Sequence, residues 1–366
     1  MRVKLKDITK FSKGTQINGK NLIDDGAYSY LNGGIKPSGK WNEFNVAENT
    51  VTISEGGNSS GYVNYMNEAF WCGAHCYYLY DGPKNSKYLY YALKSQQERL
   101  FRIRSGACMP NIKKSDLGNF IIEYEEDETR QEEVVKVLEK CELLIEDYNK
   151  KLVLLDEAVR ARFVEMFGTI RENSHNYPRV TLKEVCHKIT DGKHGGCKQE
   201  DNSGYYYVGA REIYDGKIHY DTAPQITYDD FSKDYRRCNL EKGDMVIVNT
   251  GATIGKSAIA SSHLTEKTLL QKSVALIKVN SDIIIAEFLR YCYMVNPSMY
   301  MVKSASAQPN LLLSKMNSTI VYLPPIDLQR QFASFVEEID KSRSRIQKSL
   351  EASQELFDSL MQEYFG

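Results

Sequence analysis

The sequence predicts a mixed α/β protein in which two globular domains are separated by two long antiparallel coiled-coil helices, with an internal pseudo-twofold repeat. Three observations predict this fold. The sequence repeats with a period of roughly 200 residues, each repeat ends in a segment with a heptad pattern, and the part before each such segment carries short apolar runs of strand length.

The repeat is clearest where each half passes from its globular part to its helix. The segment CMPNIKKSDLGNFIIEYEEDETRQEE, which starts at Cys108, aligns with AQPNLLLSKMNSTIVYLPPIDLQRQF, which starts at Ala307. Pro110-Asn111 recurs as Pro309-Asn310, and the Phe-Gly pair that ends the first helix at Gly168 recurs at Gly366. The chain is therefore expected to contain the same unit twice.

The end of each unit has the periodicity of a long helix. Apolar residues alternate in steps of three and four, which is the seam of a coiled coil. Because the first helix leaves one domain and the second must run back to pair with it, the two are expected to be antiparallel. Asp127 and Asp327 are the expected N-caps. The predicted helix-pairing seam comprises Val134, Leu138, Ile145, Leu152, Leu155, Phe335, Ile339, Ile346, Phe357 and Leu360.

These patterns divide the chain into four parts. The expected limits are 1–125 for the first globular domain, 126–168 for the central helix, 169–323 for the second domain and 324–366 for the C-terminal helix. Apolar periodicity predicts strands and helices in both domains. The strands are expected at Val51–Ser54, Cys76–Tyr80, Tyr205–Ala210, Met245–Asn249 and Val274–Val279, and the helices at Ser86–Arg99 and Asp282–Val295.

Composition limits the class of protein. The N-terminus MRVKLKDITKF has no apolar signal core and no apolar run is long enough to span a bilayer, so a cytoplasmic protein is expected. Cys72 and Cys76, and the group Cys186, His187, His194 and Cys197, lack the paired spacing of a structural zinc site, so no metal is expected.

Charge is unevenly distributed along the chain. Residues 126–168 carry twelve acidic and seven basic side chains, and residues 327–366 carry eight and five. Since the whole chain has a net charge of −1, the remaining residues carry +7. Basic globular parts between acidic helices indicate contact with nucleic acid. Tyrosines beside arginines, such as Tyr205 to Tyr207 before Arg211, suit either nucleic-acid contact or packing on a half-buried sheet.

The stretch VNTGATIGKS, from Val248 to Ser257, resembles a phosphate-binding loop. A P-loop needs four residues between its first glycine and Gly-Lys-Ser/Thr, but only three separate Gly251 from Gly255. The stretch is instead expected to be a turn after a buried strand, with glycines that adopt positive φ.

These features together resemble the specificity (S) subunits of type I restriction-modification systems. The resemblance covers nearly the whole chain and is based on the twofold repeat, the Pro-Asn motif before a strand, LPPIDLQRQFASFV from Leu323, and GDMVIVNTGATIGKSAI from Gly243. It implies two target-recognition domains that read the halves of a split sequence in double-stranded DNA. It also implies helices that dock two methyltransferase (M) subunits, with restriction (R) subunits attached through them.

On this resemblance the chain is non-catalytic by itself and binds no cofactor, while S-adenosylmethionine binds in the M subunits. The family's recognition domains vary with their targets, so the candidate DNA contacts are chosen by their chemistry alone. They are Lys36, Lys40, Asn58, Arg102 and Arg104 in the first domain, and Lys193, His194, Arg211, Arg236, Arg237 and Lys256 in the second.

Two functions of other classes remain as alternatives. A non-catalytic coiled-coil scaffold would bind no DNA, and a coiled-coil NTPase would bind ATP at VNTGATIGKS. The charge distribution and the duplicated globular parts favour the DNA-reading subunit over both alternatives.

Overall fold

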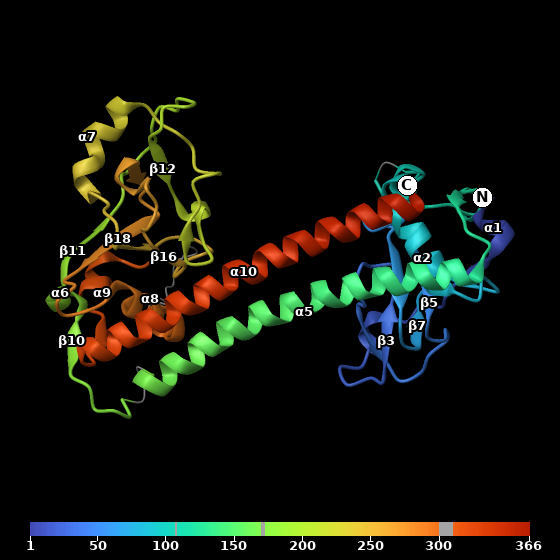
Figure 1. The fold of residues 1–366 in the computed structure, drawn as a ribbon, viewed down its shortest axis with the longest axis horizontal. Helices are drawn as coiled ribbons and strands as arrows, with labels where there is room; N and C mark the ends of the chain where they lie inside the picture. Colours follow the sequence, from blue (N-terminus) through green and yellow to red (C-terminus); the bar gives the residue numbers. More distant parts are fainter. Residues whose placement is uncertain (107, 170–172, 300–309) are drawn as a thin grey trace. The chain divides into compact units, whose positions relative to one another are not determined.

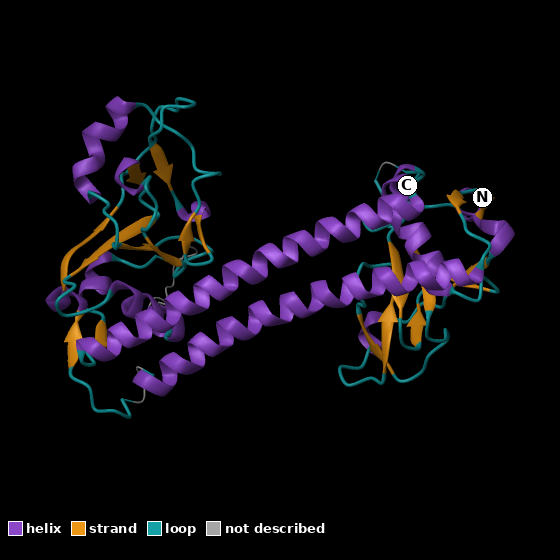
Figure 2. Ribbon diagram, in the orientation of Figure 1, coloured by secondary structure: helices purple, strands orange, loops and turns teal. Residues whose placement is uncertain are grey.

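The computed structural model describes residues 1–106, 108–169, 173–299 and 310–366, so Pro309 of the second Pro-Asn motif lies outside the described residues. The chain forms two compact units, one of Met1–Lys150 with Gln347–Gly366 and one of Lys151–Ile346. Figure 1 labels the elements along the chain, and Figure 2 shows two long helices beside short strands. These helices are α5 (Glu128–Phe167) and α10 (Ile326–Phe365), and each contributes residues to both units.

Unit 1 is built around a four-stranded antiparallel sheet in the order β2-β8-β5-β6, with a parallel pair β3-β7 and a small antiparallel pair β1-β9. Its elements are β1 (Arg2–Lys4), α1 (Leu5–Ile8), β2 (Lys10–Lys13), η1 (Gly19–Asn21), β3 (Tyr28–Leu31), β4 (Gly39–Trp41), β5 (Thr50–Ser54), β6 (Val63–Met66), β7 (Phe70–Cys72), β8 (Cys76–Tyr80), α2 (Ser86–Ser95), α3 (Gln97–Arg102), α4 (Lys114–Gly118) and β9 (Ile121–Glu123).

Unit 2 repeats this arrangement. Its four-stranded sheet has the order β11-β18-β15-β16, its parallel pair is β12-β17 and its small antiparallel pair is β10-β19. Its elements are β10 (Arg179–Thr181), α6 (Leu182–Val185), β11 (Cys186–Asp191), β12 (Tyr206–Val208), η2 (Ala210–Glu212), β13 (Ile213–Tyr214), β14 (Lys217–Ile218), α7 (Tyr228–Cys238), β15 (Met245–Val248), β16 (Ser257–Ile259), η3 (Thr265–Lys267), β17 (Thr268–Leu270), β18 (Val274–Val279), α8 (Ala286–Val295), η4 (Pro297–Met299), α9 (Leu313–Asn317) and β19 (Ile320–Tyr322). The duplication predicted from the sequence is therefore confirmed in the order and pairing of the strands.

Most predicted elements lie within a few residues of their expected limits, and the differences have local causes. The helix expected over Ser86–Arg99 is broken at Gln96, whose φ of −97° and ψ of 20° interrupt the helix between α2 and α3. The helix expected from Asp282 begins only at Ala286, because the buried Gln329 side chain accepts a hydrogen bond from the Ile285 N–H at 2.9 Å and fixes the entry to α8.

The two expected N-caps have different outcomes. Asp127 caps α5, since its carboxylate accepts a hydrogen bond from the Thr129 N–H at 2.9 Å. The prediction for Asp327 is wrong, because α10 already begins at Ile326, directly after two prolines. Proline is favoured at a helix start, where no partner for its missing N–H is needed. Asp327 instead lies in the first turn and pairs with Arg330 at 3.3 Å.

Unit 1 has a core that both long helices complete. Val134 and Leu138 of α5 are buried there with Phe365 near the end of α10, and Phe357 and Leu360 pack against the same core. Gln96 donates a hydrogen bond to the Phe365 carbonyl at 2.9 Å. Since the beginning of α5 meets the end of α10, the helices are antiparallel in this unit.

Unit 2 has the reciprocal arrangement. Phe163 and Phe167, near the end of α5, pack on Phe332 at the start of α10, with ring centroids 5.4 and 5.6 Å from that of Phe332. Phe335 and Ile339 pack against the same core. Asp156 of α5 pairs with Arg343 of α10 at 2.7 Å. The remaining seam residues, Ile145, Leu152, Leu155 and Ile346, are half-buried.

Candidate nucleic-acid interface

In unit 1, three loops at one end of the four-stranded sheet are joined by backbone hydrogen bonds. Glu55, at the start of the β5–β6 turn, accepts from Ile112 N–H and donates to the His75 carbonyl, at 2.9 and 2.8 Å. The Gly57 N–H donates to the Pro110 carbonyl at 2.9 Å. We call residues 55–62, 73–75 and 105–114 the unit 1 loop surface. The Pro-Asn motif stabilises this surface through its backbone hydrogen bonds.

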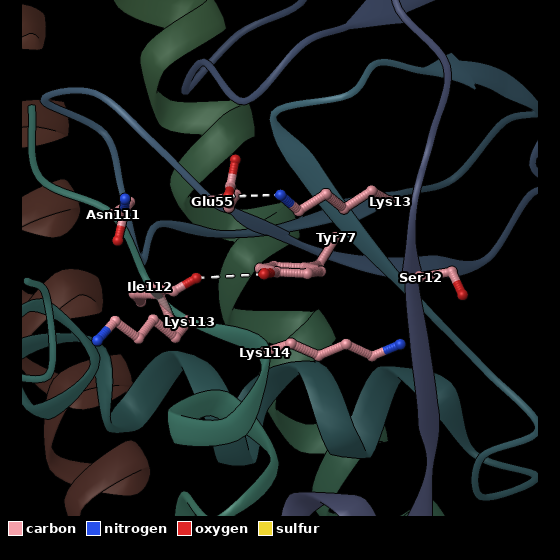
Figure 3. Close-up of a pocket in the computed structure, with 8 residues that line it drawn as sticks. All are labelled: Ser12, Lys13, Glu55, Tyr77, Asn111, Ile112, Lys113 and Lys114. Carbon is pink, nitrogen blue, oxygen red and sulfur yellow. Dashed lines mark hydrogen bonds and ion pairs between the residues drawn. The ribbon is translucent and has the colours of Figure 1, made fainter.

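A hollow of about 600 Å³ opens beside this surface (Figure 3), and it is lined by Ser12, Lys13, Glu55, Tyr77, Asn111, Ile112, Lys113 and Lys114. Lys13 is directed at Glu55 and pairs with it. Lys113 and Lys114 are exposed and make no ion pair within the described residues. An open, basic hollow of this kind suits a phosphate group of a nucleic-acid backbone.

The floor of the hollow is fixed by Tyr77. Its hydroxyl donates a hydrogen bond to the Ile112 carbonyl at 3.2 Å (Figure 3). Burial, helped by the negative charge of Glu55, raises the pKa of Tyr77 to about 12, so the phenol stays protonated at neutral pH. Tyr77 therefore supports the Asn111–Lys114 segment as a neutral hydrogen-bond donor.

Of the five candidate contacts in this unit, Asn58 belongs to the loop surface, Arg104 contacts it, and Lys36 follows a turn that is attached to it. Arg104 donates to the Asn58 carbonyl at 3.3 Å, and the turn before Lys36 is held there because the Ser59 hydroxyl donates to the Gly33 carbonyl at 2.6 Å. Arg102 lies elsewhere, in a second hollow with Arg99 and Asp116, and Lys40 lies on β4. The structure does not bring Arg102 and Lys40 to the loop surface.

In unit 2, the stretch that resembles a P-loop is a β-hairpin turn. Two backbone hydrogen bonds close this turn. The Val248 N–H donates to the Lys256 carbonyl at 2.8 Å, and the Gly255 N–H donates to the Val248 carbonyl at 2.9 Å. Gly251 and Gly255 have φ of 99° and 90°, as expected for glycines in a turn. The turn leads into strand β16, whereas a P-loop leads into a helix. This contradicts the NTPase alternative.

The segment 270–273 joins the loops of unit 2 that carry candidate contacts. The Asn249 N–H donates to the Ser273 carbonyl at 3.0 Å, which attaches the hairpin that ends at Lys256. The Lys193 N–H donates to the Leu270 carbonyl at 2.7 Å, and the Gln271 N–H donates to the Val208 carbonyl at 2.8 Å, close to the turn that carries Arg211. We call these joined segments, residues 192–196, 208–211, 249–256 and 270–273, the unit 2 loop surface.

Two candidate contacts of unit 2 form ion pairs with acidic side chains of the same unit. Lys193, whose side chain is 13% exposed, pairs with Asp234, and Arg237 pairs with Asp191. Asp191 also accepts a hydrogen bond from His194 at 2.9 Å. These pairs hold α7 to the sheet. Arg211, Arg236 and Lys256 are exposed.

Burial works to raise the pKa of Asp191, but the hydrogen bonds from Arg237 and His194 outweigh this effect, so the pKa of the carboxyl is lowered.

We expect Asp191→Asn to lower the free energy of unfolding by about 1–3 kcal/mol at pH 7, because it leaves Arg237 without its anionic partner. A carboxyl whose folded-state pKa is lowered stabilises the protein above its unfolded pKa, about 3.9, and this contribution disappears as pH falls through the folded value. Urea unfolding at pH 7 and pH 3 measures the difference.

The control for this prediction is Asp229→Asn, which removes an exposed carboxylate from α7, the helix that carries Arg237, and is expected to change stability little. A stability difference between Asp191→Asn and the wild type that is equally large at both pH values would contradict the charge pairing.

Several basic residues of these surfaces are not among the contacts predicted from the sequence. Lys113 and Lys114 directly follow the Pro110-Asn111 motif, so the repeat itself marked their position, and Lys272 lies in the segment that joins the unit 2 loops. Lys13 could not be found from its neighbours, because β2 and β8 come together only in the folded sheet.

The cysteines first considered as metal ligands lie in other surroundings. Cys72 and Cys76 are both buried, and the Cys72 thiol donates to the Cys76 carbonyl at 3.4 Å. Burial raises the pKa of Cys186 to about 12. No group of three or more metal-ligating side chains occurs within the described residues, and no helix described is both long and apolar enough to cross a bilayer.

Comparison with known proteins agrees with this architecture. The family model described as "Type I restriction modification DNA specificity domain" matches residues 1–154 and 175–354. A putative type I specificity subunit of Mycoplasma genitalium is 26% identical over 360 residues, which cover 96% of this chain and 90% of that protein. A second putative type I specificity subunit, from Mycoplasma pneumoniae, is 31% identical over 220 residues, 56% of this chain and 58% of that protein.

Solved structures show the same fold. The crystal structure of a type I restriction-modification S subunit from M. genitalium matches with a TM-score of 0.68 and 22% identity, covering 100% of this chain and 96% of that chain. A chain from a structural study of the complex assembly of a type I system matches with a TM-score of 0.53 and 14% identity, covering 99% and 96%. Because the family model matches each half of a duplicated fold, the chain belongs to the family of DNA specificity subunits of type I restriction-modification systems.

Proposed function

We propose that the chain reads a split target in double-stranded DNA, with each unit reading one half. The observation that carries this proposal is one scaffold used twice with different chemistry at corresponding places. Ile112 and Leu311 make the same hydrogen bond to the loop after the central strand, through the carbonyls of Glu55 and Asn249. The next two residues are Lys113-Lys114 in unit 1 but Leu312-Leu313 in unit 2.

A shared scaffold with different loop residues suits the reading of two different sequences. Main-chain hydrogen bonds and buried apolar residues hold the loops, so their exposed side chains are free to differ. Since sequence is read by side chains at base edges, such differences alter the bases that are recognised.

We propose further that the long helices dock two M subunits, which bind S-adenosylmethionine and carry the R subunits. Support comes from apolar side chains of α5 that remain about half or more exposed. Leu143 and Leu144 are 63% and 48% exposed in unit 1, and Val153 and Leu154 are 57% and 60% exposed in unit 2. Leucines gathered on an exposed helix surface mark sites of protein association.

Reconstitution tests this proposal. The chain alone is expected to methylate no DNA, and its mixture with cognate M subunits is expected to form an assembly of one S with two M subunits. With S-adenosylmethionine, that assembly is expected to methylate adenine within a split sequence. An active complex with a single M subunit would contradict the docking of two. A complex that binds no DNA would support a scaffold instead.

The independence of the two units can be tested by exchange. We expect that replacing Thr181–Tyr322 with the matching segment of a relative changes one half of the methylated sequence and leaves the other half unchanged, because the segment holds the unit 2 loop surface and no part of unit 1. Sequencing that detects methylated bases gives the result. If both halves of the target change together, the units do not read separately.

A further inference from the structure

Helix α7 distinguishes unit 2 from unit 1. The connection from the first strand of the parallel pair to the central hairpin covers residues 32–49 in unit 1 and residues 209–244 in unit 2. The longer connection contains α7, and the described residues of the shorter one contain only β4. An element present in one copy of a duplicated scaffold is a source of chemistry specific to that copy.

The inner face of α7 is firmly attached to unit 2. Phe231 packs against Tyr205 and Tyr235, and its ring centroid lies 4.6 and 4.8 Å from theirs. Asp234 pairs with Lys193, and Asp230 accepts a hydrogen bond from the Lys198 N–H at 2.7 Å. Thr227 caps the start of the helix, and Asn239 ends it with a φ of 52°. The helix is therefore a rigid element whose orientation is set by the domain.

The outer face of α7 is polar, and its last two turns are basic. Tyr228, Ser232 and Arg236 are spaced four residues apart, so they form one stripe, with Lys233 beside it. All four are exposed, and so is the acidic Asp229 in the first turn, one turn before Lys233. Of the two acidic residues that face inward, Asp234 pairs with Lys193 and Asp230 accepts a hydrogen bond from the Lys198 backbone N–H, while no ion pair within the described residues involves Lys233 or Arg236. Folding has thus left the positive charges of the last two turns directed at solvent.

The position and charge of this face fit duplex DNA. Arg237 attaches α7 to Asp191, next to the loop that carries His194, and Lys188 donates to the Arg236 carbonyl at 3.4 Å. Further basic residues therefore lie near the C-terminal end of the exposed stripe. A helix fits the major groove, and eleven residues span about 16 Å, enough to reach several base pairs.

The geometry points to α7 as the recognition helix of unit 2, which enters the major groove of one half-site and places Ser232, Lys233 and Arg236 against base edges. This inference rests on the proposed function, since it names the element by which unit 2 reads its half of the target. Arginine binds guanine through two parallel hydrogen bonds, so Arg236 is expected to contribute the largest share of the discrimination.

The test uses the complete complex with M subunits and a DNA library that is randomised in both half-sites. We expect Arg236→Ala to relax the preference at one or two base pairs of a single half-site by about ten- to a hundred-fold. The other half-site is expected to stay unchanged. Arg236→Lys is expected to restore DNA affinity without restoring the preference, because lysine lacks the planar fork of arginine. The matched control is Lys183→Ala, which removes an exposed positive charge from α6.

Results other than these would contradict the inference in different ways. Unchanged specificity and affinity would overturn the inference, and so would an equal loss of affinity for all sequences, which indicates contact with phosphates only. Loss of M-subunit binding would show that α7 faces a protein. A wild-type complex that methylates no split sequence would overturn the proposed function itself, and this inference with it.

Discussion

Replacing Leu143 and Leu144 with glutamate is expected to lower the affinity of the chain for an M subunit on the order of 100-fold or more, with a corresponding loss of methylation. Burying a leucine side chain at an interface contributes about 1.5–3 kcal/mol. The two glutamate substitutions would also place charges in an apolar contact. Both leucines are exposed in the free chain, so its own fold is expected to be unaffected. Co-purification and a methylation assay measure the result.

The matched control is the double variant Leu143→Met with Leu144→Met, which keeps the apolar volume and is expected to retain M-subunit binding. If the glutamate variant binds M subunits as tightly as the wild type, this part of α5 is not a docking surface. A glutamate variant that unfolds at a lower temperature would instead show that the leucines support the fold.

Phe332→Ala is expected to lower the free energy of unfolding of unit 2 by about 3–5 kcal/mol. Phe332 is fully buried and its ring lies among those of Phe163, Phe167 and Tyr291. Removing it leaves a cavity where α5, α8 and α10 meet. For a domain of this size the loss corresponds to a fall in Tm of roughly 6–20 °C, which calorimetry detects.

The control is Phe44→Ala, which makes the same chemical change at a ring that is 51% exposed and is expected to cost far less. Limited proteolysis adds a local measurement, since cleavage within unit 2 is expected to increase in the Phe332 variant. A Tm close to that of the wild type would show that the aromatic cluster is not what joins the helices to this domain.

The parts of the fold that the sequence predicted are those with strong periodicity. The strands at Cys76–Tyr80 and Val274–Val279 have their expected limits, because each is a buried apolar run of strand length. The long helices were predictable from their seams. Helix α7 was not predicted, since its inner face uses charged and aromatic residues in place of an aliphatic stripe.

The candidate site was predictable only in part, because charge in a sequence does not reveal its partner. Lys193 and Arg237 have the chemistry of DNA contacts, yet Asp234 and Asp191, far from them in the sequence, neutralise them in the fold. Tyr207 similarly lies beside basic residues in the sequence but is buried. Arg104 and Asn58, by contrast, lie together, because the Arg104 side chain donates a hydrogen bond to the Asn58 carbonyl.

The reciprocal packing of the long helices has a consequence for the biosynthesis of the protein. Residues 347–366 belong to unit 1, where Met361 and Phe365 are buried in a core formed mainly by the first 150 residues. The ribosome makes these residues only after all of unit 2 has been synthesised. Nascent unit 1 therefore emerges with part of its apolar interior uncovered, and it stays unfinished while the second unit is made. Contacts between segments so distant in the chain close slowly, and the uncovered surface needs protection from aggregation during that interval.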